Sequence, residues 1–147
     1  MALDTSVIIA ALQTWHEDHD AASSSLNKLL ASDSAVLPSR VLVEAFSVMT
    51  RMPTPHRLSP QDAFTLLKST FEGVTPLVQL SSEAYWEFLD VLTREGITGG
   101  AVYDSEIIEC ARQAGVRSIL TLNRGDFERL APEGIRVLTP LNDDTVP

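Results

Sequence analysis

Short apolar segments alternate with longer stretches of helical spacing along the chain, and this alternation limits the folds open to it. Apolar runs of strand length cover residues 1–3, 35–37, 77–80, 117–121 and 135–138. The stretches between them space their apolar residues as helices do, over about residues 7–12, 21–31, 39–52, 59–71, 84–93, 102–113 and 126–130. Strands that alternate with helices in this way predict an α/β fold with a parallel sheet.

The size and cysteine content favour one domain in a reducing compartment. A chain of 147 residues has the length of a single domain. Its one cysteine, Cys110, excludes an internal disulfide, and the apolar neighbours of Cys110 predict a buried thiol. The apolar run at residues 7–12 is too short to cross a membrane and follows no basic segment. We therefore expect a cytoplasmic protein without membrane association.

Aspartates follow two of the predicted strands, at the end where α/β proteins bind their ligands. Asp4 ends the first predicted strand, and Asp126 lies shortly after the fourth. Ligands of open α/β sheets bind beyond the carboxyl ends of the strands, near the point where the strand order reverses. If these two strands are neighbours, both carboxylates lie at one edge of the sheet.

Glu44 is the acidic residue in an otherwise apolar part of the predicted helix 39–52. Residues three, four and seven positions away share its helical face, which places Glu44 in a polar stripe with Arg40, Ser47 and Arg51. The opposite face is apolar and carries Leu42, Ala45, Phe46 and Met49. A solvated face with internal ion pairs is the ordinary alternative, but the narrow stripe between apolar flanks favours a functional carboxylate.

The remaining acids each have a structural alternative of their own. Asp4 and Asp126 can cap the helices that follow them, and Asp104 lies in the first turn of the predicted helix 102–113. An acidic residue at such a position stabilises a helix by about 1 kcal/mol without any further role. Each position is weak alone, and it is the combination of all these acids with Glu44 that favours a shared site.

A shared site of this composition predicts a bound divalent cation. Carboxylates that converge repel one another and raise each other's pKa, and a cation removes that cost. Ligand sets made only of oxygen favour the hard ions Mg²⁺ and Mn²⁺ over zinc. Mg²⁺ keeps several waters, and one of these can attack a phosphodiester.

Four short segments carry these acids. They are 3–8 (Leu-Asp-Thr-Ser-Val-Ile), 39–44 (Ser-Arg-Val-Leu-Val-Glu), 99–104 (Gly-Gly-Ala-Val-Tyr-Asp) and 121–127 (Thr-Leu-Asn-Arg-Gly-Asp-Phe). In order and spacing they resemble the motifs of PIN-domain nucleases, and most closely the VapC-type toxins of bacterial type II toxin–antitoxin systems. The resemblance covers about residues 1–140 as one PIN domain, and residues 141–147 are expected to form a polar C-terminal tail.

This resemblance implies a three-layer α/β/α sandwich with a parallel central sheet of about five strands. It implies an endoribonuclease that leaves a 5′-phosphate and a 3′-hydroxyl. Asp4, Glu44 and Asp104 would hold Mg²⁺ or Mn²⁺, and Asp126 would complete the acidic pocket. The residues that would position water, phosphate or a partner are Thr5, Ser6, Thr121, Asn123 and Arg112. The family further implies a homodimer silenced by a cognate antitoxin, which presents a basic residue to the carboxylates.

The chain departs from the family pattern at two positions. Many PIN-domain proteins have an acid at the place of Asn123, so either Asn123 or Asp126 is the fourth site residue. Ser105 follows Asp104 at a place where relatives often carry alanine, a change that we expect to be minor.

The net charge of −9 argues against general nucleic-acid binding, because phosphate contacts need basic residues. It is compatible with a metal site or with a basic protein partner. An aspartyl-phosphate enzyme is a less favoured alternative, since Asp4 is not followed by a second acid two residues later and the only lysines are Lys28 and Lys68. A catalytically silent PIN-fold module that binds RNA or protein is the second alternative.

Two histidines and two tryptophans carry weaker signals. His16 and His19 lack the spacing of a metalloprotease motif, and an exposed loop is the favoured interpretation, with a substrate contact as the alternative. We expect Trp15 and Trp86 to lie in the core or at a dimer contact rather than to stack on bases.

Overall fold

A parallel arrangement of five short strands forms the centre of the computed structural model, which describes residues 1–140. The strands are β1 (Ala2–Leu3), β2 (Leu37–Pro38), β3 (Leu77–Val78), β4 (Ser118–Leu120) and β5 (Arg136–Leu138). Strand β4 pairs with β1 and β5, and β2 pairs with β3, in each case parallel. A parallel bridge from Ala2 to Val36 joins the two sets, so the spatial order is β3-β2-β1-β4-β5. The predicted parallel sheet is confirmed.

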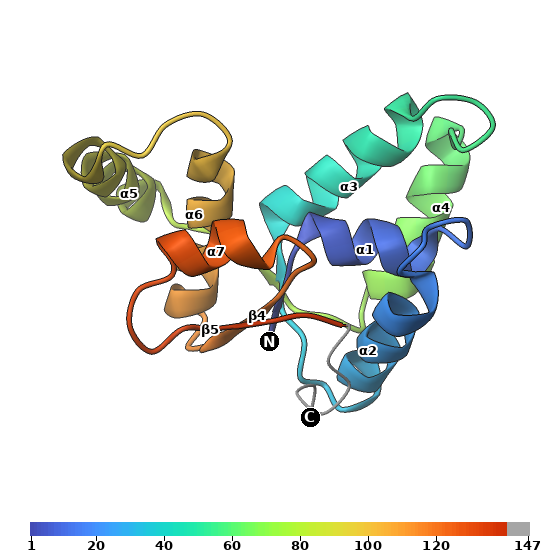
Figure 1. Cartoon of the computed structure of the whole chain (residues 1–147), viewed down its shortest axis with the longest axis horizontal. Coiled ribbons are helices and arrows are strands. Elements are labelled where there is room, and N and C mark those ends of the chain that lie inside the picture. The colour runs from blue at the N-terminus through green and yellow to red at the C-terminus, as the bar shows by residue number, and fades with distance from the viewer. Residues whose placement is uncertain (141–147) are drawn as a thin grey trace.

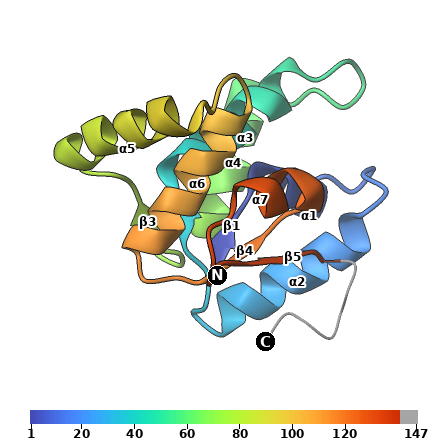
Figure 2. The same cartoon turned by 60° about the vertical axis from the view of Figure 1, so that its left-hand side comes forward.

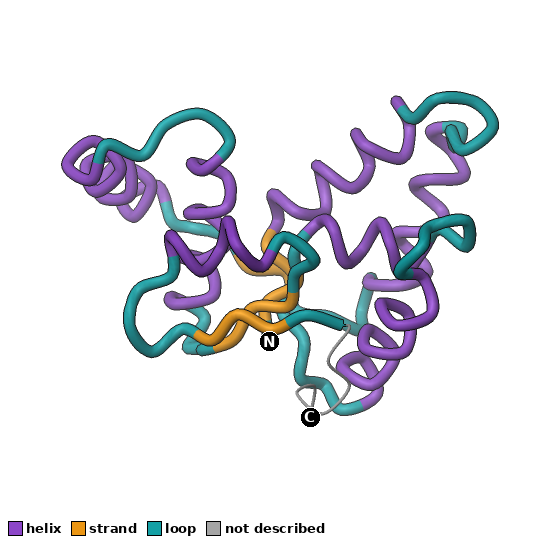
Figure 3. The backbone as a smooth tube through the Cα atoms, viewed as in Figure 1, coloured by secondary structure: helices purple, strands orange, loops and turns teal. Residues whose placement is uncertain are grey.

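Helices lie on both sides of these strands (Figures 1 and 2). They are α1 (Thr5–Leu12), α2 (His19–Ala31), α3 (Ser39–Arg51), α4 (Pro60–Phe71), α5 (Ser82–Glu95), α6 (Ala101–Gln113) and α7 (Arg124–Leu130). In Figure 1, α3 with α4 and α5 with α6 form two arms above the strands, while α1 and α7 lie between the arms. Figure 3 shows how small the strand share of the chain is beside the helices. The predicted tail at residues 141–147 lies outside the described residues.

The expected strand boundary at Pro38 is wrong by one residue. The sequence predicts a strand at residues 35–37 and a helix from about residue 39, whereas in the structure Pro38 also pairs, with Val78 in β2, and Ser39 is the first residue of α3. Proline fits here because its φ of −60° and ψ of 133° are extended. The backbone donor at this point is Leu37, whose N–H is hydrogen-bonded to the Pro76 carbonyl at 2.9 Å. The helix therefore follows the strand without a separate capping residue.

The main core holds the segments that carry the acids. Leu3 of β1, Ile8 of α1 and Leu120 of β4 are completely buried, so the ends of β1 and β4 are fixed by packing on both sides. Helix α7 buries a single residue, Phe127, directly after Asp126. The position of Asp126 therefore depends on the packing of one aromatic side chain, that of Phe127.

A smaller apolar cluster lies between α5 and α6 and contains Leu80, Phe88, Leu92 and Cys110. The predicted burial of Cys110 is confirmed, and burial raises the pKa of this thiol to about 11. A thiol with so high a pKa is almost entirely protonated at neutral pH and is a poor nucleophile.

The core interpretation of the two tryptophans is wrong. Trp15 is 43% exposed and Trp86 is 75% exposed, because Trp86 lies on the face of α5 that points away from Phe88 and Leu92. The Trp15 ring instead lies against the His56 ring, with 4.2 Å between centroids. A dimer contact at Trp86 stays a prediction. No helix among the described residues has the length and apolar character needed to cross a membrane.

Candidate active site

The pairing of β1 with β4 places Asp4 beside Thr121. The two strands are parallel neighbours, so the residues that follow them emerge at the same edge of the sheet. Asp4 Oδ2 accepts hydrogen bonds from Thr121 Oγ1 at 2.7 Å and from Ser6 Oγ at 2.5 Å. This is the point where the strand order reverses, between β1 and β4, and it is where an α/β sheet binds its ligands.

Asp4 is almost completely buried, with 4% of its surface exposed. Burial raises the pKa of this carboxyl, and the hydrogen bonds from Ser6, Thr121 and the Thr5 backbone act in the opposite direction. Asp4 also caps α1, since its Oδ1 accepts the Thr5 N–H at 2.7 Å. The capping alternative is therefore correct, and the charge of the same carboxylate also acts on Asp104.

The predicted hydroxyl residues hold the acids and the strand ends in place. Thr5 Oγ1 donates to Glu44 Oε2 at 2.9 Å and so links α1 to α3. Ser6 Oγ accepts the Leu122 N–H at 3.0 Å, and Thr121 Oγ1 accepts the Asn123 N–H at 2.9 Å. These hydroxyls are engaged within the protein, so they orient carboxylates and backbone more directly than they could orient a ligand.

Asp104 lies in the first turn of α6, as predicted, and faces the other acids. Its pKa is raised to about 6, first by burial and then by the negative charges of Asp4, Asp126 and Glu44. Together with Glu44 and Asp126 it lines the acidic hollow, a cavity of about 380 Å³ between α3, α6 and α7. Four acids from four separate segments thus come together at one place.

Asn123 and Asp126 differ in their position relative to the acidic hollow. Asp126 lines the acidic hollow and pairs with Arg129 one helical turn later. Asn123 does not line it, and its side chain makes no capping hydrogen bond at the start of α7. Asn123 instead anchors the turn through its backbone, which accepts the Asp126 N–H at 3.1 Å. Of the two, Asp126 is the side chain placed beside Glu44 and Asp104.

Arg112 is not brought to the acidic hollow. It lies eight residues beyond Asp104 on α6, which corresponds to about 12 Å along the helix axis. Its guanidinium binds Glu109 through two hydrogen bonds, of 2.6 and 2.7 Å. Arg112 therefore lies outside the acidic hollow, at the far end of α6, and its expected contact with phosphate or with a partner stays a prediction.

The histidine loop serves local structure. His16 Nδ1 accepts the Asp18 N–H at 3.1 Å, and His19 Nδ1 lies 3.0 Å from the Ala10 carbonyl oxygen. Both imidazoles are engaged within their own loop and its neighbouring helix. The alternative of a substrate contact for these histidines has no support in their positions.

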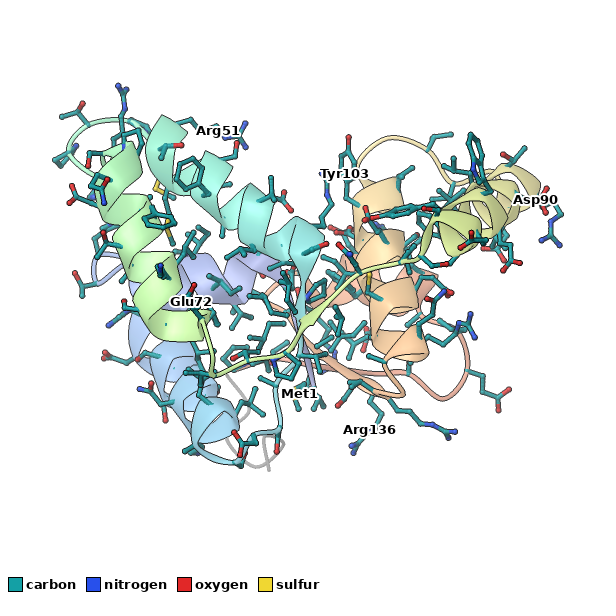
Figure 4. All side chains as sticks on the ribbon, turned by 180° about the vertical axis from the view of Figure 1, so that it is seen from behind. Met1, Arg51, Glu72, Asp90, Tyr103 and Arg136 are labelled. Carbon is teal, nitrogen blue, oxygen red and sulfur yellow. The ribbon has the colours of Figure 1, made fainter. Side chains whose placement is uncertain are left out.

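Three further side chains at the site were not predicted for it. Arg129 lines the acidic hollow, and its spacing of three residues from Asp126 on one helix was the available signal. Tyr103 also lines the hollow, and the Arg40 guanidinium lies 3.5 Å from the centroid of its ring. Figure 4 shows Tyr103 at the end of α6 that lies nearest α3. Contact between residues on two helices leaves no periodic signal in a sequence.

The donor set at the hollow suits a hard cation. Glu44, Asp104 and Asp126 offer only carboxylate oxygens, the ligands that Mg²⁺ and Mn²⁺ prefer. Within residues 1–140, no three side chains of the ligating types are already close enough together to hold an ion directly. Mg²⁺ usually keeps several waters and uses only one or two carboxylates, so water-mediated contacts fit this spacing.

The arrangement of four acids at the β1–β4 edge agrees with the comparison to known families. The model of the PIN domain family matches residues 1–132. The chain belongs to the PIN-domain family. Within it, this PIN domain is 34% identical over 135 residues to ribonuclease VapC40 of Mycobacterium tuberculosis, a match that covers 90% of this chain and 96% of VapC40. The resemblance to VapC-type proteins that the four motifs indicated is confirmed.

Solved structures show the same fold for the PIN domain. The crystal structure of Mycobacterium tuberculosis VapC20, described as a toxin that cleaves the sarcin–ricin loop, superposes with a TM-score of 0.69 at 18% identity, over 92% of this chain and 98% of VapC20. VapBC2 from Rickettsia felis, bound to a DNA fragment from its promoter, gives 0.63 at 19% identity, over 94% of this chain and 96% of that one. The predicted α/β sandwich with a parallel sheet is confirmed by these matches.

Proposed function

We propose that this PIN-domain protein is a metal-dependent endoribonuclease and the toxin of a type II toxin–antitoxin pair. The observation that carries the proposal is the convergence of Asp4, Glu44, Asp104 and Asp126 at the end of β1 and β4. The pKa of Asp104 is raised to about 6, first by burial and then by the negative charges of the other three acids. A site that gathers negative charge in this way is suited to a cation. The relation to a curated ribonuclease at 34% identity adds independent support.

In this proposal each acid has a separate task at the metal. Glu44, Asp104 and Asp126 line the hollow and would hold Mg²⁺ or Mn²⁺ directly or through water. Asp4 is buried, and its negative charge contributes to the raised pKa of Asp104. A bound divalent ion supplies an activated water and neutralises charge on the phosphodiester under attack. The expected products are a 5′-phosphate and a 3′-hydroxyl.

The hydroxyl residues would hold this geometry. Thr5 keeps Glu44 in place through its 2.9 Å hydrogen bond, and Thr121 fixes Asp4 at 2.7 Å. Carboxylates oriented before substrate binding need no reorganisation during the reaction. Arg129, bound to Asp126, is placed to release that carboxylate to a metal and to turn toward the RNA phosphate.

Three further features belong to the same proposal. A basic residue from a cognate antitoxin would bind in the acidic hollow, and the net charge of −9 favours such a basic partner. The solved VapBC2 structure gives a precedent for the pairing in a protein of the same fold. We also propose that the protein forms a homodimer and acts in the cytoplasm, where its RNA substrates lie.

RNA cleavage in the presence and absence of metal tests the proposal. Antitoxin-free protein is incubated with end-labelled structured RNAs in Mg²⁺ or Mn²⁺, then with EDTA, then with excess metal restored. We expect cleavage that EDTA abolishes and metal restores, with a phosphate at the 5′ end of the downstream fragment. Absence of cleavage across several RNA classes, together with absence of metal binding by calorimetry, would instead identify a silent binding module.

A further inference from the structure

A groove that we call the arginine groove lies on the opposite side of Glu44 from the acidic hollow. It runs between α3 and the start of α6, has a volume of about 720 Å³, and is lined in part by Arg40, Arg51 and Tyr85. Glu44 and Tyr103 line both this arginine groove and the acidic hollow. The two therefore adjoin at these side chains, and a ligand that extends past Glu44 and Tyr103 occupies both.

Arg40 has an unusual environment in this groove. Its guanidinium lies flat enough on Tyr103 to place its central carbon 3.5 Å from the ring centroid. Its Nε is buried and has no hydrogen-bond partner among the described residues. A guanidinium stacked on an aromatic ring keeps its N–H groups in its own plane, directed to the side, where they can bind a planar or tetrahedral anion. Buried donors without an acceptor are rare, so the unpaired Nε shows that the hydrogen-bonding capacity of Arg40 is not fully used by the described residues.

Five other lysines and arginines among residues 1–140 form ion pairs with carboxylates. Lysine or arginine pairs with an acid at Lys68–Glu72, Arg94–Asp90, Arg112–Glu109, Arg124–Glu128 and Arg129–Asp126. Within residues 1–140, neither Arg40 nor Arg51 forms an ion pair, although acids line the same groove. Of these acids, Glu44 accepts from Thr5 and Glu106 accepts from Tyr85 at 2.8 Å. The two arginines thus remain available to an anion.

The geometry points to Arg40 as a phosphate-binding residue for the RNA strand beside the scissile bond, with Tyr103 as the residue that positions it. This inference rests on the proposed ribonuclease function and adds a substrate contact to it. A strand whose scissile phosphate lies at Asp104 continues past Glu44 into the arginine groove, where Arg40 binds a neighbouring phosphate. Arg51 lies three helical turns further along the same face of α3 and provides a second positive charge for the RNA strand in the arginine groove. A chain with a net charge of −9 needs such a local basic surface to bind RNA at all.

Salt-dependent RNA binding tests this contact. Asp104→Asn protein, which by the proposed function is expected to bind RNA without cleaving it, is titrated into a fluorescein-labelled oligouridylate at increasing salt, because phosphate contacts do not depend on base sequence. Adding Arg40→Gln should raise Kd about tenfold, as expected for loss of a charge-assisted hydrogen bond. The slope of log K against log salt should fall by about 0.7, the value for one phosphate contact on a single strand.

Matched variants separate the contact from net charge and from folding. Arg94→Gln removes the same charge from an exposed ion pair on α5, outside the groove, and should change Kd by less than about twofold. Arg40→Lys keeps the charge but loses the planar stack on Tyr103, so it should recover only part of the affinity. Urea unfolding of both Arg40 variants establishes that each is folded before binding is compared.

The outcomes distinguish this inference from the function on which it rests. Wild-type protein that cleaves RNA, with Arg40→Gln equal to Arg94→Gln in Kd and salt slope, would overturn the inference and leave the ribonuclease intact. If Arg40→Gln binds RNA normally but no longer retains its co-expressed antitoxin, the groove is a protein-docking surface and the inference is equally wrong. A wild-type protein that neither binds nor cleaves RNA would refute both.

Discussion

At the scale of single residues, the site is held by a balance between repulsion and hydrogen bonding. Burial raises the pKa of the Asp4 carboxyl, and hydrogen bonds donated by Ser6, Thr121 and the Thr5 backbone oppose that rise. Burial and then its acidic neighbours raise the pKa of Asp104 to about 6. Repulsion among the gathered charges therefore contributes to the raised pKa of Asp104.

Asp104→Asn should stabilise the metal-free protein at neutral pH. The carboxyl titrates near 3.8 in the unfolded chain and near 6 in the folded one, so the folded state loses stability as pH rises from about 4 to 6. The amide removes this loss, by on the order of 1 kcal/mol after allowance for the partial solvent exposure of the group. Urea unfolding in EDTA at pH 7 and pH 4 measures it. A variant less stable than wild type at pH 7 would contradict the assignment of repulsion to Asp104.

Ser105→Ala should also stabilise the protein, through a different cause. The Ser105 hydroxyl is buried in α6 and has no hydrogen-bond partner among the described residues. Alanine removes this unsatisfied group and favours the helix, for a gain of about 1 kcal/mol. Thermal or urea unfolding checks the prediction, with Ser24→Ala at an exposed position of α2 as the control for helix propensity. Equal gains in the two variants would show that the Ser105 hydroxyl is satisfied.

At the scale of elements, the pairing of β1 with β4 creates the site. The position of Asp4 after a strand could be read from the sequence, but the neighbour of that strand could not, because strand order depends on long-range packing. The same limit applies to side chains on separate helices. Contact between Arg40 and Tyr103 depends on how α3 and α6 approach each other, and the two residues are far apart in the chain. Periodicity predicts which face a residue occupies and says nothing of the partner helix.

The wrong core interpretation of the two tryptophans has the same origin. Trp86 is apolar enough for a core, but α5 packs only one face against the molecule. The approximate helix ranges, the cap at Asp4 and the acidic motifs were predictable because they depend on neighbours in sequence, whereas the cap expected at Asp126 is wrong because α7 already begins at Arg124.

Phe127→Ala should detach the element that carries Asp126. Phe127 is completely buried and is the only buried residue of α7, so its loss leaves a cavity and an unanchored helix. We expect a loss of about 3–5 kcal/mol in the free energy of unfolding. Phe64→Ala on α4 is the control, since Phe64 is 52% exposed and should lose much less. Similar losses in the two variants, measured by urea unfolding, would show that α7 is held by other contacts.

At the scale of the whole molecule, metal binding and folding should be linked. The four acids come from segments spread between Asp4 and Asp126, so an ion bound to them stabilises the folded chain as a unit. At a metal concentration of about one hundred times Kd, the gain should be about 2.7 kcal/mol. Thermal unfolding in Mn²⁺ and in EDTA measures it. Mn²⁺ should raise the Tm of wild type and leave the Tm of Asp104→Asn almost unchanged. Wild type should then be the more stable protein in Mn²⁺, whereas Asp104→Asn should be the more stable protein in EDTA.

The central claim is that these carboxylates form the catalytic site of a metal-dependent ribonuclease. Its most direct test compares the rate of RNA cleavage in Mn²⁺ by wild type, Asp104→Asn and Glu128→Gln. Glu128 pairs with Arg124 on the exposed face of α7 and does not line the acidic hollow, so it controls for the loss of one negative charge. The account predicts a loss of at least about a hundredfold for Asp104→Asn and a rate close to wild type for Glu128→Gln. Undiminished cleavage by purified, folded Asp104→Asn would contradict it.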